Sequence, residues 1–108
     1  MSEIVITSAK RTPIGKFLGG LSHLSAPELG KLSIENVIND SKVSKELIDE
    51  VIMGQVLTGG SGQNPARQSS FLSGIPEDKS ALTINQVCGS GLRSISIGAQ
   101  SIMTNQSE

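Results

Sequence analysis

The stretch NQVCGSGLRSI, residues 85–95, contains the only cysteine of the chain, Cys88, and two glycines, Gly89 and Gly91, follow it closely. A thiolate is a strong nucleophile, so nucleophilic catalysis is the chemistry to consider. A lone cysteine is more often a small buried side chain without reactivity. The elements on either side of Cys88 help to choose between these interpretations.

The pattern around Cys88 places it between a strand and a helix. LTINQV, residues 82–87, is typical of a strand, and the apolar residues that follow recur at helical spacing (Leu92, Ile95, Ala99, Ile102 and Met103). In open α/β sheets ligands bind beyond the carboxyl ends of the strands, and the free N–H groups and dipole of a helix amino end favour an anion. The same N–H groups can receive the oxyanion of acyl transfer, and the glycines let a substrate approach the backbone closely. We therefore predict that Cys88 is an activated nucleophile.

Three strands are predicted to form the sheet that carries this junction. They cover residues 3–8, 51–57 and 82–87, and the continuous apolar run of the second is typical of a parallel strand covered on both faces. The alternation of strands with helices predicts an α/β fold with three mainly parallel strands. We expect the first strand to lie at an edge of this sheet.

Three helices are predicted between and after the strands. SAPE, residues 25–28, can form a capping box, and NP, residues 64–65, supplies a cap followed by a proline at the first helical position. The third helix follows Cys88. Gly98 lies inside it, where glycine weakens a helix by ~1 kcal/mol, so we expect Gly98 to permit a close backbone contact.

Composition excludes several classes of function. The chain has 108 residues and a formal net charge of −1, and its nine basic residues are scattered, so nothing indicates nucleic acid binding. One cysteine and one histidine can form neither an internal disulfide nor a structural zinc site. No apolar run approaches the ~20 residues of a membrane span. We expect a cytoplasmic protein that uses no cofactor or metal and does not bind membranes.

The remaining candidate motifs give weaker signals. The glycines at 59–62 and 89–91 do not form a dinucleotide-binding fingerprint, and Ser90 lacks the frame of a hydrolase nucleophile elbow. Arg67 and Arg93 could bind phosphate, although arginines on helices are more often surface charge. The single histidine, His23, lies in an early glycine-rich loop, where a solvated side chain is expected.

Longer stretches resemble a known family. NQVCGSGLRSI resembles the nucleophile motif of thiolases, especially those of the acetyl-CoA acetyltransferase type. IVITSAKRTPIGKFLGGL resembles the opening strand and loop of that family, and VIMGQVLTGGSGQNPARQSSFLSGIP resembles its second strand, glycine loop and helix. The resemblance implies the N-terminal part of a thiolase-like fold. Because thiolases are much longer chains, we expect residues 1–108 to be a partial N-terminal thiolase domain, truncated after the nucleophile helix.

The resemblance also implies a reaction. Cys88 would be the catalytic residue and would take an acyl group from an acyl-CoA, and acetyl-CoA would then attack to give a 3-ketoacyl-CoA and CoA. Thiolases supply a second cysteine, a histidine and an asparagine for the second step from later segments, and no family motif includes His23. We therefore expect no turnover by this chain alone, and a homo-oligomer or a complementing C-terminal chain as its partner. The alternatives are a non-catalytic truncated thiolase-like remnant and, ranked last, a small redox or binding module that uses Cys88.

Overall fold

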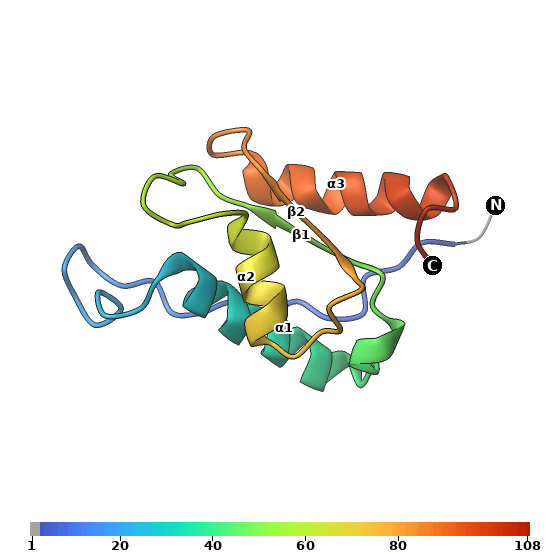
Figure 1. The fold of residues 1–108 in the computed structure, drawn as a ribbon, viewed down its shortest axis with the longest axis horizontal. Coiled ribbons are helices and arrows are strands. Elements are labelled where there is room, and N and C mark those ends of the chain that lie inside the picture. The colour runs from blue at the N-terminus through green and yellow to red at the C-terminus, as the bar shows by residue number, and fades with distance from the viewer. Residues whose placement is uncertain (1–2) are drawn as a thin grey trace.

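The computed structural model describes residues 3–108, and Figure 1 shows how their helices and strands are arranged. In chain order the elements are α1 (Ala26–Ser41), the short 3-10 helix η1 (Lys45–Leu47), β1 (Glu50–Gly54), α2 (Pro65–Leu72), β2 (Ser80–Ile84) and α3 (Ser90–Met103). The three predicted helices are confirmed. Of the three predicted strands, the second and third are confirmed with bounds shifted by a few residues.

The two strands form a parallel sheet whose register runs from Glu50 opposite Ser80 to Gly54 opposite Ile84. Helices α1 and α2 lie on one face of this sheet and α3 lies along the other, as Figure 1 shows. β1 is thereby covered on both faces, which its continuous apolar run predicts. Both strands end at the same edge of the sheet, and α3 begins just beyond that edge.

The predicted strand over residues 3–8 is wrong. This segment is extended but unpaired, with Val5 63% and Ile6 75% exposed. Within residues 3–108 no backbone hydrogen bond joins it to another segment, and Ser8 and Lys10 attach it to α1 only through the carboxylate of Asp40, at 2.7 and 3.2 Å. β-branched residues favour an extended backbone, but a strand also needs a neighbour in register, and this segment lies against α1 and pairs with neither β1 nor β2.

The core lies between the sheet and the pair α1 and α2. Its buried centre consists of Ile34 and Ile38 from α1, Val51 from β1, and Ile75 just after α2. The partly buried side chains of Ile48, Met53 and Ala81 pack around this centre. The layer that positions β1 and β2 is therefore built mainly on one face of the sheet.

The start of α1 is fixed by the predicted capping box. The Ser25 hydroxyl accepts a hydrogen bond from the Glu28 N–H at 3.3 Å, and the Glu28 carboxylate accepts one from the Ser25 N–H at 2.7 Å. The bond from the Ser25 backbone is the main cause that lowers the pKa of Glu28. α2 starts in a similar way, because the Asn64 side chain accepts a hydrogen bond from the N–H of Arg67 at 3.3 Å.

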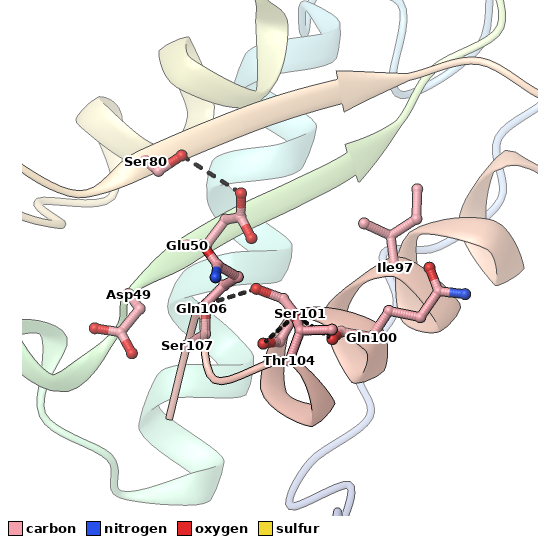
Figure 2. Close-up of a pocket in the computed structure, with 9 residues that line it drawn as sticks. All are labelled: Asp49, Glu50, Ser80, Ile97, Gln100, Ser101, Thr104, Gln106 and Ser107. Atoms are coloured by element: carbon pink, nitrogen blue, oxygen red, sulfur yellow. Dashed lines mark hydrogen bonds between the residues drawn. The ribbon is translucent and has the colours of Figure 1, made fainter.

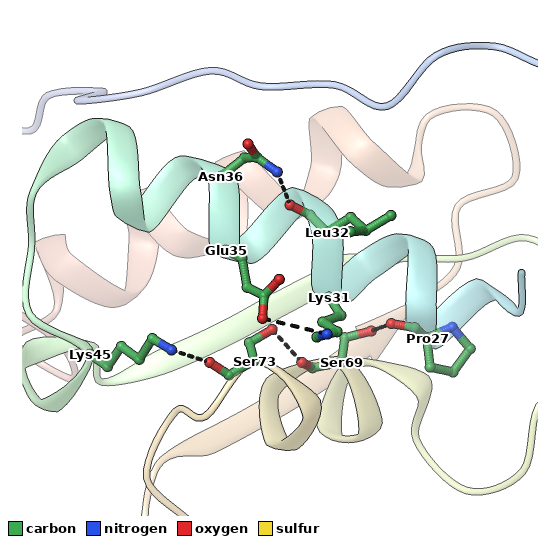
Figure 3. A network of polar contacts seen from close by, with 8 residues as sticks. All are labelled: Pro27, Lys31, Leu32, Glu35, Asn36, Lys45, Ser69 and Ser73. Carbon is green, nitrogen blue, oxygen red and sulfur yellow. Dashed lines mark hydrogen bonds and ion pairs between the residues drawn. The ribbon is translucent and has the colours of Figure 1, made fainter.

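Close packing and polar contacts join α1 to α2, as Figure 3 shows. Gly30 of α1 approaches Ser69 of α2 so closely that a Cβ on Gly30 would lie 2.3 Å from the serine Oγ. That Oγ donates to the Pro27 carbonyl at 3.0 Å, and the Lys45 Nζ donates to the Ser73 carbonyl at 2.5 Å. These contacts hold α2, and with it the start of β2, against the rest of the chain.

Only Ala99 and Ile102 of the predicted apolar stripe of α3 are half-buried, and the rest of the stripe is exposed. Ser90 is the only buried residue of α3, whereas Leu92 is 77% and Ile95 56% exposed. Gly98 does face the sheet, but a Cβ there would meet only the Ile52 Cδ1 at 3.9 Å, an ordinary contact. The expected close approach is therefore absent at Gly98. It occurs instead at Gly54, which lies against the first residues of α3.

Candidate active site

Cys88 lies in the turn of residues 85–89, which joins the end of β2 to the start of α3. Its thiol is free and exposed, and the residue after it, Gly89, is the N-cap of α3. The predicted location between strand and helix is confirmed. The catalytic role of Cys88 stays a prediction.

Two side chains hold the backbone of this turn. The Asn85 Oδ1 accepts a hydrogen bond from the Val87 N–H at 2.8 Å. The Ser90 Oγ accepts one from the Gln86 N–H at 2.8 Å and donates one to the Val87 carbonyl at 2.6 Å. Val87, the residue before the thiol, is thus bonded through both of its backbone polar groups.

Val87 has an unusual backbone conformation, with a φ of 48°. A β-branched residue in this left-handed region is a genuine outlier, and such a conformation costs about 1–3 kcal/mol. It persists only where surrounding contacts impose it, and strained residues of this kind cluster at functional sites. The strain lies directly beside the candidate nucleophile.

The turn is also attached to the end of β1. The Asn85 Nδ2 donates to the Val56 carbonyl at 3.0 Å, and the Gln55 N–H donates to the Ile84 carbonyl at 3.0 Å. The site is therefore built where both strands end, as expected for an α/β sheet. Sequence reasoning did not assign roles to Asn85 and Ser90, although both lie in the quoted motif and both are polar residues at element ends.

The start of α3 offers hydrogen-bond donors close to Cys88 in the chain. The N–H groups of Gly89 and Ser90 donate to Gln86 and Val87 within the turn. Those of Gly91 and Leu92 have no acceptor among residues 3–108. A Cβ on Gly91 would meet nothing within 4 Å, so its Cα faces open space, while its nitrogen lies against Gly54. This helix end can therefore present N–H groups to an oxyanion.

The other candidate residues lie outside this turn. Arg67 donates to the carbonyls of Glu77 and Lys79 at 2.9 and 3.0 Å, so its guanidinium holds the loop before β2. His23 is exposed in the loop before α1, and Arg93 is exposed on α3. The glycine loop after β1 is bonded to α2, through the Gln68 Nε2 and the Ser61 carbonyl at 2.6 Å.

A cavity of about 520 Å³ lies at the opposite end of the sheet, where both strands begin (Figure 2). Its lining includes Asp49 and Glu50 at the start of β1, Ser80 at the start of β2, and Thr104 after α3. Cys88 is not part of this lining. The cavity and the candidate nucleophile are therefore separate features.

Within residues 3–108, no cluster of His, Cys, Asp and Glu could hold a metal ion, and none of the helices has the length and apolar character needed to cross a membrane.

Comparison with known proteins identifies the class to which this fold and turn belong. The sequence model of the thiolase N-terminal domain matches residues 4–108, so the chain belongs to the thiolase family. The Acat5 thiolase from Ascaris suum, solved in complex with coenzyme A, has the same α/β fold, with a TM-score of 0.85 and 44% identity over 87% of this chain and 25% of that one.

Within the family, the chain is similar to acetyl-CoA acetyltransferases. It is 50% identical over 108 residues to the acetyl-CoA acetyltransferase of Cupriavidus necator and 49% identical over 108 residues to the probable acetyl-CoA acetyltransferase of Escherichia coli K12. Each match covers 100% of this chain and 28% of the relative. The chain therefore spans a little over a quarter of the length of these relatives.

Proposed function

We propose that this chain carries the nucleophile of a thiolase-type acyltransferase, in which Cys88 forms an acyl-cysteine intermediate. The reaction converts an acyl-CoA and acetyl-CoA to a 3-ketoacyl-CoA and CoA. The observation that carries the proposal is the free, exposed thiol of Cys88 one residue before the N-cap of α3. The acetyltransferase relatives and the coenzyme A complex of the similar structure support CoA thioesters as substrates.

In the first step, the Cys88 thiolate attacks the carbonyl carbon of the acyl-CoA. A bond forms between this carbon and the Cys88 sulfur, the bond to the CoA sulfur breaks, and CoA leaves as a thiolate that takes up a proton. Exchange of one thioester for another is nearly balanced in energy, which suits a cysteine nucleophile. Negative charge develops on the carbonyl oxygen, and the unpaired N–H groups of Gly91 and Leu92 are the donors that α3 offers to it.

In the second step, acetyl-CoA loses a proton from its methyl carbon to a base. The resulting carbanion attacks the acyl carbonyl carbon, and the Cys88 thiolate leaves. The resemblance assigns this base and its partners to a second cysteine, a histidine and an asparagine, while the chain has one cysteine and one histidine, the exposed His23. The proposal therefore gives residues 1–108, as the N-terminal part of a thiolase domain, the nucleophile of the first step, and a complementing C-terminal segment or chain the groups of the second.

The first step can be tested by acetylation of the chain itself. The chain is incubated with acetyl-CoA, its intact mass is followed, and released CoA is measured by chromatography. We expect one acetyl group per chain on the wild type and none on Cys88→Ala. A urea-unfolded sample is the control for the intrinsic reactivity of a thiol, and equal acetylation of folded and unfolded chain would contradict the proposal.

The second step is tested by an assay for acetoacetyl-CoA. We expect no detectable condensation by this chain alone, because a positioned general base contributes about 10²–10⁴-fold and substrate positioning contributes more. Turnover that depends on Cys88 without a second polypeptide would show that groups within this chain supply the second step. Absence of both acetylation and condensation would favour the non-catalytic remnant.

A further inference from the structure

Ser90 is the only residue of α3 that is buried, with 3% of its surface exposed, and it lies directly beneath the turn that carries Cys88. Its hydroxyl group does not bond within the helix. It accepts from the Gln86 N–H at 2.8 Å and donates to the Val87 carbonyl at 2.6 Å. Both bonds act on the two residues that precede the thiol.

These bonds bear on the strained residue of the turn. Val87 has a φ of 48°, and its N–H donates to the Asn85 side chain at 2.8 Å. The Ser90 hydroxyl fixes the other end of the same residue through its carbonyl oxygen, which belongs to the peptide group shared with Cys88. Without the hydroxyl, this carbonyl keeps only the longer bond from the Ser90 N–H at 3.2 Å. Because the conformation is intrinsically unfavourable, loss of the hydroxyl bond or of the Asn85 contact lets this peptide plane rotate, and the rotation moves the Cys88 side chain.

The position of Ser90 is fixed because its backbone packs directly against β1. A Cβ on Gly54 would lie 2.6 Å from both the carbonyl carbon and the Cβ of Ser90, so strand and helix touch without an intervening side chain. The Ser90 hydroxyl therefore fixes the turn relative to the sheet. Ser94, one turn later, makes a similar bond to the Gly91 carbonyl at 2.6 Å, but this bond does not reach the turn.

We propose that Ser90 is a positioning residue for the Cys88 thiol, holding Val87 in its left-handed conformation through a hydroxyl group that bridges Gln86 and Val87. The proposal rests on the proposed function, because acyl transfer is the reaction for which the thiol is positioned. It differs from a general structural role in its consequence. Attack on a bound thioester depends on the direction of the thiol, whereas alkylation by a small reagent depends mainly on its exposure.

The experiment compares Ser90→Ala with the wild-type chain, and Ser94→Ala is the matched control. Asn85→Ala is a second variant, which removes the side chain that accepts from the Val87 N–H. Three quantities are measured for each: the rate of Cys88 acetylation by acetyl-CoA, the rate of alkylation by iodoacetamide, and hydrogen exchange of the Gln86 amide. We expect Ser90→Ala to acetylate about 10- to 100-fold more slowly, since small misplacement of reacting groups has effects of this size. Alkylation should change little, and Gln86 should exchange faster.

Each outcome decides the proposal. Slower acetylation in Ser90→Ala and Asn85→Ala, but not in Ser94→Ala, supports it. Acetylation at the wild-type rate overturns it, and so do equal changes in acetylation and alkylation, because a general loss of structure affects both. If the wild-type chain is not acetylated at all, the proposed function fails. The positioning of the turn is then decided by Gln86 exchange and by the HN–Hα coupling of Val87, which both shift in Ser90→Ala if Ser90 holds the turn and stay unchanged if it does not.

Discussion

Gly54, at the end of β1, and Ser90, at the start of α3, are in direct contact through their backbones. A Cβ on Gly54 would lie 2.6 Å from the Ser90 carbonyl carbon and 2.8 Å from the Gly91 nitrogen. Real side chains do not reach such distances, so this position requires the absence of a side chain. The contact sets the distance between the sheet and the helix that follows Cys88, and thereby fixes where the candidate nucleophile stands.

Gly54→Ala should therefore destabilise the chain and disturb the turn. The new methyl group meets backbone atoms that cannot rotate away, and overpacking of this kind costs about 1–3 kcal/mol. We expect a lower urea midpoint and slower acetylation of Cys88 by acetyl-CoA. An unchanged midpoint would show that α3 can move away from β1 at no cost.

Gly98→Ala is the matched control on the same helix and should have the opposite effect. A Cβ at Gly98 meets only the Ile52 Cδ1 at 3.9 Å, which is normal van der Waals contact. Replacing a helical glycine by alanine removes a penalty of about 0.8–1.0 kcal/mol, so the free energy of unfolding should rise by up to this amount. A fall in the urea midpoint would indicate a closer approach of α3 to β1 than the geometry gives.

Two adjacent serines of α2 should respond in opposite ways to replacement by alanine. Ser70 is fully buried and its hydroxyl has no partner among residues 3–108, whereas the Ser69 hydroxyl donates to the Pro27 carbonyl at 3.0 Å. An unsatisfied buried polar group costs about 1–3 kcal/mol, and a hydrogen bond contributes about 0.5–1.5 kcal/mol. Ser70→Ala should therefore raise the free energy of unfolding and Ser69→Ala should lower it. Urea titration of both variants tests this, and destabilisation by Ser70→Ala would mean that its hydroxyl has a partner.

The attachment of the N-terminal segment to α1 should be lost at acid pH. The hydrogen bond from Ser8, followed by the hydrogen bond and charge of Lys10, lowers the pKa of Asp40 below its ordinary value of 3.8. Since the folded pKa is depressed, the stabilising contribution is present above pH 3.8 and is lost as the pH falls through the lower, folded value. The NMR chemical shifts of Ser8 and Lys10, whose side chains contact this carboxylate, should therefore move toward their random-coil values in this acid range.

Asp40→Ala should give random-coil chemical shifts for Ser8 and Lys10 at every pH, since the carboxylate that their side chains contact is gone. Glu77→Ala is the control, because this carboxylate lies in the exposed loop before β2. The mechanism is refuted if Ser8 and Lys10 have the same chemical shifts in Asp40→Ala and in the wild type above pH 3.8.

Features encoded by neighbouring residues were predictable from the sequence. The capping box of Ser25 and Glu28 and the Asn64 cap each depend on residues three positions apart, and the structure shows both. The location of Cys88 also followed from a local change of pattern, from strand to helix. Family resemblance added the class of reaction, which no local pattern defines.

Features that depend on distant segments were not predictable. Residues 3–8 have the composition of a strand, but pairing requires an edge supplied by another part of the fold. The contact of Gly54 with Ser90 joins residues from two elements, and helical periodicity alone pointed to Gly98 instead. The role of Ser90 in holding Val87 was not predictable for the same reason. The burial and the hydrogen-bond partners of a hydroxyl group are known only from the folded structure.

The apolar stripe of α3 should control the solubility of the chain. Leu92 is 77% and Ile95 56% exposed, one helical turn apart, whereas Ile97 and Ile102 of the same helix are half-buried. Exposed apolar patches promote association, so the wild type should bind a hydrophobic dye and self-associate. Leu92→Glu with Ile95→Lys removes both side chains and adds a favourable i,i+3 charge pair, worth about 0.2–0.5 kcal/mol. We expect weaker dye binding and a smaller sedimentation coefficient at unchanged helix content. Ile34→Glu, at a buried core position, is the control that should unfold the chain. Equal loss of structure in the double variant would show that the stripe packs within the chain.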